Sequence, residues 1–97
     1  MNYIESIQDA IHRLHGCESR HTESVPVHEE FQGQTVWNGT VEIFELIGHP
    51  KAKGCYAWGH RAGKADKQSR YVIVLKIPPI DSPEAAVRAS IASEFRG

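Results

Sequence analysis

The stretch GCYAWGH, residues 54–60, decides the fold, because it alternates small residues with large rings. In an extended strand, successive side chains point to opposite faces of the sheet. The small residues therefore share one face and the rings share the other: Cys55, Ala57 and Gly59 against Tyr56, Trp58 and His60.

Small side chains on a strand allow a helix to approach closely, so we expect residues 55, 57 and 59 to face the helices. Two helices cover only one face of a four-stranded sheet and leave the other face to solvent or to a partner. The rings would then lie on the open face, where an exposed aromatic row marks a binding surface or a dimer interface. In the alternative, the rings fill the core and the small residues face water.

Apolar residues recur at three- and four-residue spacing near the N-terminus: Ile4, Ile7, Ile11 and Leu14. This spacing places them on one stripe of a helix. Asn2 is the expected N-cap, and Glu5, three residues later, completes a capping box. Gly16 supplies the left-handed residue that ends the helix.

Four segments with a period of two follow, at residues 20–31, 35–46, 55–61 and 70–77. Pro26 has no backbone donor, so the first segment should be an edge strand. The second segment has apolar residues on both faces. It is either a central strand covered twice or a strand with a bulge near residues 38–39 that exchanges its faces.

A second helix is predicted after the last strand. Pro78 and Pro79 end that strand because neither can donate to a ladder. Asp81 or Ser82 then caps a helix with Pro83 in its first turn. Within this helix, residues 84 and 88 are a glutamate and an arginine at the spacing of an i,i+4 pair.

The order helix, four strands, helix predicts a single α+β domain over residues 1–97, a four-stranded antiparallel sheet with the N- and C-terminal helices packed on one face. The predicted core joins both helices to alternate residues of the last strand. Its members are Ile4, Ile7, Ile11, Leu14, Val87, Ile91 and Phe95 against Tyr71, Ile73, Leu75 and Ile77 or against Val72 and Val74.

The composition excludes several classes of protein. The chain is 40% hydrophobic and 24% charged, which argues against a disordered chain. No apolar run approaches the about 18 residues that a membrane span requires. The N-terminal residues do not have the pattern of a signal peptide. We therefore expect a cytoplasmic protein with Cys17 and Cys55 as free thiols.

The net charge of −1 conceals an uneven distribution. Residues 1–50 carry two arginines against eight acidic residues, whereas residues 51–70 carry six basic residues against one aspartate. Such asymmetry bears on partners rather than on the fold. The alternative is that the basic loop serves only solubility.

One histidine-rich segment has side chains that suit zinc: His12, His15, Cys17 and His21. Its spacing matches no standard zinc finger, so we expect no metal. A nucleophilic pair of Cys55 with His60 is excluded because the two side chains have opposite parity. No phosphate-binding loop or nucleophile motif is present, and we predict no catalytic residue and no cofactor.

The remaining candidate site combines rings with cations. Single-stranded nucleic acid binds where aromatic faces stack on bases and basic loops follow the backbone. The predicted ligand-binding residues are Trp37, Tyr56, Trp58, His60, Arg61, Lys64, Lys67 and Arg70.

The order of elements resembles that of the double-stranded-RNA-binding domain in topology alone. The chain has a fourth strand, and the last helix, in SPEAAVRASIASEF (82–95), lacks the lysine-rich first turn of that family. Membership of the family is therefore not inferred.

Three functions follow from these residues. The first is a small non-catalytic binding module that presents an aromatic and basic sheet face to nucleic acid or another polyanion. The second is a homodimeric interaction protein that uses the same face. The third is a small-ligand pocket or an enzyme lined by Trp37, Tyr56, Trp58 and His60.

Overall fold

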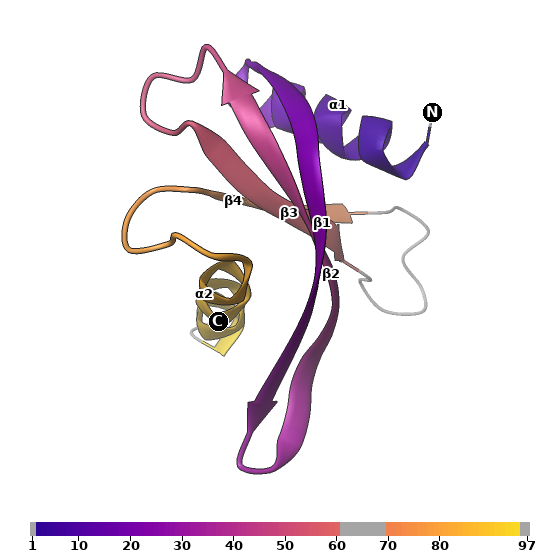
Figure 1. Ribbon diagram of the computed structural model, residues 1–97, viewed down its shortest axis with the longest axis vertical. Helices are drawn as coiled ribbons and strands as arrows, with labels where there is room; N and C mark the ends of the chain where they lie inside the picture. Colours follow the sequence, from indigo (N-terminus) through magenta and orange to yellow (C-terminus); the bar gives the residue numbers. More distant parts are fainter. Residues whose placement is uncertain (1, 61–69, 96–97) are drawn as a thin grey trace.

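The computed structural model describes residues 2–60 and 70–95, and its elements follow the predicted order (Figure 1). They are α1 (Tyr3–His15), β1 (Glu18–Phe31), β2 (Gln34–Ile47), β3 (Gly54–His60), β4 (Arg70–Leu75) and α2 (Pro83–Phe95). The strands form one antiparallel sheet in the order β1-β2-β3-β4. The predicted α+β architecture is confirmed.

Both ends of α1 are capped as predicted. The Glu5 N–H donates to Asn2 Oδ1 at 2.8 Å, and the Asn2 N–H donates to Glu5 Oε1 at 3.2 Å. Gly16 ends the helix with a φ of 68°, in the left-handed region that favours glycine.

The two helices lie on opposite faces of the sheet, so the prediction that both pack on one face is wrong. On one face, α1 packs Ile7 and Ile11 into a cluster with Cys55 and Ala57. On the other face, where Figure 1 shows α2, Val87 packs into a cluster with Tyr56 and Trp58. The reason is that β2, β3 and β4 are apolar on both faces, and each face requires a cover.

The prediction that Tyr56 and Trp58 of β3 are exposed is also wrong. Tyr56 is 2% exposed and Trp58 is 4% exposed, beneath α2. The small residues do allow the close approach of a helix, as expected, but that helix is α1 alone. The second strand is covered on both faces, and its register with β1 is regular at residues 38–39, so the interpretation as a central strand covered twice is the correct one.

Three residues of the predicted core are buried, and most of the others are only partly buried. Ile7, Ile11 and Val87 are fully buried. Leu14 is 65% exposed although it lies on the same stripe, because burial of α1 is confined to residues 7–11. Ile77 is 37% exposed, since β4 ends at Leu75. The side chain of residue 95 lies outside the described part.

The cap of α2 is confirmed, because the Ala85 N–H donates to Ser82 Oγ at 3.1 Å. Arg88 does not form the expected pair with Glu84. It bonds instead to Glu29, which ties the helix to β1. No helix among the described residues is long and apolar enough to cross a membrane.

The β1–β2 hairpin extends beyond the rest of the sheet as a two-stranded arm (Figure 1). β2 pairs with β3 only over residues 42–45, whereas it pairs with β1 along its length. Pro26 lies in β1, which is an edge strand as predicted. Two register shifts interrupt the β1–β2 ladder, with Thr22 as the extra residue in β1 and Val36 as the extra residue in β2.

Candidate functional site

A gap opens in the sheet where β2 and β3 stop pairing. The last pair of their ladder is Glu42 with Ala57. Beyond it, β2 continues with β1, whereas β3 continues with β4 through Trp58 and Gly59. If the ladder continued for two more residues, Thr40 would face Gly59.

The backbone groups of Thr40 and Gly59 point into this gap. Hydrogen-bonded pairs alternate along an antiparallel ladder, and the Leu46 N–H donates to Lys53 O at 2.8 Å. The next bonded positions toward the gap are therefore 44 with 55, 42 with 57 and 40 with 59. The sheet leaves hydrogen-bonding groups here that need other partners.

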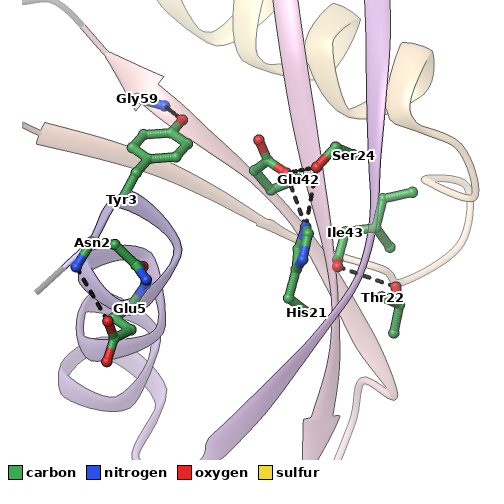
Figure 2. A network of polar contacts seen from close by, with 9 residues as sticks. All are labelled: Asn2, Tyr3, Glu5, His21, Thr22, Ser24, Glu42, Ile43 and Gly59. Atoms are coloured by element: carbon green, nitrogen blue, oxygen red, sulfur yellow. Dashed lines mark hydrogen bonds and ion pairs between the residues drawn. The ribbon is translucent and has the colours of Figure 1, made fainter.

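Tyr3 supplies one of these partners. Its hydroxyl accepts a hydrogen bond from the Gly59 N–H at 2.8 Å (Figure 2). A side chain on residue 59 would crowd the ring, because an added Cβ would lie 3.4 Å from Tyr3 Cε1. Partial burial raises the pKa of the Tyr3 hydroxyl; the hydrogen bond from Gly59 opposes this rise, and the nearby carboxylate of Glu42 adds to it. The first turn of α1 thus closes one end of the gap.

The gap forms a cleft of about 610 Å³. Its walls come from α1 and from the three strands β1, β2 and β3. The lining residues are Tyr3, Ser24, Trp37, Asn38, Gly39, Thr40, Glu42, Trp58 and Gly59. A volume of this size suits a small molecule.

Two tryptophans line the cleft and contact each other. The ring centroids of Trp37 and Trp58 are 5.6 Å apart, with their planes at 72°. This edge-to-face arrangement is favourable for aromatic pairs. Gly39 leaves room for the first ring, since an added Cβ would lie 3.1 Å from Trp37 Cη2.

A buried carboxylate forms the polar part of the cleft. Glu42 is 6% exposed, and it is the only buried charged residue in the described part of the chain. Its Oε1 lies 2.9 Å from His21 Nε2 and also accepts a hydrogen bond from Ser24 Oγ (Figure 2). These contacts offset the cost of removing the carboxylate from water.

A β-bulge brings both partners to Glu42. His21 and Ser24 are three residues apart, so a regular strand would place them on opposite faces. The register runs from His21 opposite Phe44 to Glu23 opposite Ile43, which leaves Thr22 as the extra residue. The Thr22 hydroxyl donates a hydrogen bond to Ile43 O at 3.1 Å, which stabilises the bulge. Bulges of this kind often redirect side chains beside functional sites.

The three side chains do not form a nucleophilic triad. In such a triad the base bridges the nucleophile and the acid. Here one ring nitrogen of His21, Nε2, lies near both Ser24 Oγ and Glu42 Oε1, and Ser24 also donates to that same carboxylate oxygen, so both side chains hold the carboxylate in place. The sequence analysis did not identify this cluster, because regular alternation along a strand places His21 and Ser24 on opposite faces of the sheet. The bulge brings the two side chains to the same face.

The predicted ligand-binding residues are only partly brought together. Trp37 and Trp58 both line the cleft, whereas Tyr56 is buried in the core beside α2. Burial raises the pKa of the Tyr56 hydroxyl, with smaller contributions from Asp81 and Glu84. The remaining predictions lie outside the described residues: Arg61, Lys64 and Lys67, and the side chains of His60 and Arg70.

The candidate zinc ligands are not brought together. His12 Nε2 lies 3.9 Å from Glu18 Oε1. The His15 ring packs on the His49 ring, with centroids 5.7 Å apart, and His21 contacts Glu42. Within residues 2–60 and 70–95, no three potential metal ligands gather at one point.

Both cysteines are free and buried in the cluster beside α1. Burial raises the pKa of the Cys55 thiol to about 12, and the neighbouring Cys17 contributes to the rise. Since the thiolate is the reactive form, Cys55 is unsuited to act as a nucleophile at neutral pH.

No protein-family model, curated protein or solved structure matches the chain. The geometry of the cleft is therefore the basis for a functional proposal.

Proposed function

We propose that this chain is a small-ligand-binding domain, and that its ligand occupies the cleft between β2 and β3. The observation that carries the proposal is the separation of the two central strands beyond Glu42 and Ala57. A ladder that ends within a sheet leaves backbone groups that water or a ligand must satisfy. The cleft combines aromatic side chains with polar side chains such as Glu42, Ser24 and Asn38, and small-molecule sites use such polar groups to fix a ligand's orientation.

Trp37 and Trp58 supply the apolar wall. Both were predicted to contact a ligand, but on an open face rather than in a cleft. Two rings whose planes lie at 72° offer a face and an edge to a flat or apolar group. The polar wall consists of the Glu42 carboxylate and the backbone of Thr40.

The other two functions receive less support from the geometry. A nucleic-acid face and a dimer face both require exposed rings at Tyr56 and Trp58, which α2 covers. The basic residues of the 61–69 segment lie outside the described part, so a polyanion partner stays a prediction.

A fluorescence titration tests the proposal. The probes are 2-phenylethylamine, 2-phenylethanol and 3-phenylpropanoate, which share a ring and differ in their polar group. We expect at least one probe to change the tryptophan emission of the wild-type protein in a saturable manner. Gly39→Ala should weaken that response, because the added methyl group would lie 3.1 Å from Trp37 Cη2 and so force this wall of the cleft to move.

Gln34→Ala is the matched control, since Gln34 is exposed at the start of β2 and does not line the cleft. The proposal is wrong if no probe gives a saturable response, or if Gly39→Ala binds as tightly as Gln34→Ala does.

A further inference from the structure

The two carboxylate oxygens of Glu42 differ in their hydrogen bonding within the protein. Both contacts of Glu42 with His21 and Ser24 are made through Oε1. The second oxygen, Oε2, has no such contact among the described residues and points away from both donors (Figure 2). The bulge therefore fixes the carboxylate with one acceptor directed away from its protein partners.

No lysine or arginine is among the described residues that line the cleft. The one ionisable partner that contacts the Glu42 carboxylate there is His21. A buried carboxylate is costly unless it is paired and hydrogen-bonded. A positively charged ligand group at Oε2 would complete the pairing.

The aromatic walls favour the same kind of ligand. A cation near the face of a tryptophan or tyrosine ring is attracted by the negative charge of that face. Trp37, Trp58 and Tyr3 all line the cleft with Glu42. A carboxylate combined with aromatic walls is thus suited to an organic cation and unsuited to an anion.

We infer that the ligand is a small organic amine whose ammonium group binds Oε2 of Glu42 and whose apolar part lies against Trp37 and Trp58. The inference rests on the proposed function, because it concerns the same cleft. It adds the charge of the ligand and the residue that recognises it. Thr40, with its backbone directed into the gap, is the neighbouring acceptor for a second ammonium hydrogen.

Competition between matched probes tests this inference. At pH 7, 2-phenylethylamine is an ammonium ion, 2-phenylethanol is neutral and 3-phenylpropanoate is an anion. Isothermal titration should give the order ammonium, then alcohol, then carboxylate for the wild-type protein. Glu42→Gln keeps the shape of the side chain and removes its charge. It should weaken ammonium binding about tenfold or more, the usual range for a hydrogen bond between charged groups, and leave alcohol binding within about twofold.

Two further variants separate recognition from folding. Glu45→Gln removes a carboxylate from the same strand that is exposed, paired with Arg20 and outside the cleft, so it should bind like the wild type. Ser24→Ala keeps the Glu42 charge and should keep the preference for the ammonium probe, even if the protein is less stable.

The possible outcomes are distinct. If the wild type binds the alcohol and the ammonium equally, or if Glu42→Gln and Glu45→Gln have the same effect, the cleft binds ligands but the inference about charge is wrong. If the wild type binds none of the three probes, the proposed function fails and the inference fails with it. Should Glu42→Gln not fold, loss of the ammonium preference in Ser24→Ala would overturn the inference.

Discussion

The hydroxyl of Tyr3 accepts a hydrogen bond from the backbone N–H of Gly59 at 2.8 Å, and so joins the first turn of α1 to the end of β3. It takes the place that Thr40 would occupy if β2 and β3 remained paired. The separation of the central strands is thus part of the folded structure and is held open by a side chain.

Tyr3→Phe should therefore lower the free energy of unfolding by about 0.5–1.5 kcal/mol, the usual net value of one hydrogen bond. Gly59 is exposed, so water can replace the lost acceptor, and a value near the lower end is expected. Chemical denaturation measures the change. Tyr71→Phe is the control, since this ring packs on Tyr3 and no hydrogen bond of its hydroxyl is found among the described residues. Equal effects of the two variants would contradict the role of the Tyr3 hydroxyl.

The contact between His21 and Glu42 should be energetically coupled. A double-mutant cycle with His21→Ala and Glu42→Gln is expected to give an interaction free energy of about 0.5–3 kcal/mol, because Glu42 is buried. The exposed pair of His12 and Glu18, 3.9 Å apart, should give a value near zero by the same method. If the coupling free energy of His21 and Glu42 is also near zero, the bulge does not hold the Glu42 carboxylate in place.

Trp58 belongs to the core beside α2 as well as to the cleft. Trp58→Ala should destabilise the domain by about 3–5 kcal/mol, through the lost burial and the cavity that remains. Trp37 is only half-buried, so Trp37→Ala should cost clearly less. Thermal melts of the two variants measure the difference. Equal melting temperatures for Trp58→Ala and the parent would mean that α2 does not cover this ring.

The sequence predicted the elements of this fold well and their layering poorly. The cap of α1, the edge position of β1 and the four strands follow from local patterns that a single segment contains. The placement of the helices depends on which face of the sheet each helix covers, and that is a property of the whole chain. The alternation in β3 was predicted correctly, but it is equally compatible with rings under a helix and rings in solvent.

The candidate site was predicted in part for a similar reason. Trp37 and Trp58 were identified as ring-bearing residues with a possible ligand. Glu42 was not identified, because a single glutamate in a strand is usually solvated, and its partners His21 and Ser24 reach it only through the bulge at Thr22. A register shift of one residue leaves no clear signal in a sequence that lacks glycine at that point.

The stability of the protein should fall at alkaline pH because of Cys55. Its pKa is about 12 in the folded protein against an ordinary value of 9.0. The unfolded chain therefore loses this proton from about pH 9, whereas the folded chain keeps it until about pH 12. The stabilising contribution is complete below pH 9 and is lost as the pH rises toward 12.

Unfolding free energies of the wild type and of Cys55→Ala, measured at several pH values, test this expectation. The difference between the two proteins should shrink as the pH rises from 9 to 12, by at most about 1.4 kcal/mol per pH unit. Parallel curves over this range would contradict the burial of the Cys55 thiol.

The central claim, that the gap between β2 and β3 is a ligand site, is tested most directly by the N–H chemical shifts of the backbone amides and tryptophan indoles during a titration with 2-phenylethylamine. We predict that the largest saturable changes occur at Thr40, at Gly59 and at the indole N–H of Trp37. Binding that leaves these three signals unchanged and shifts residues elsewhere, such as those along β4 and α2, would contradict the claim.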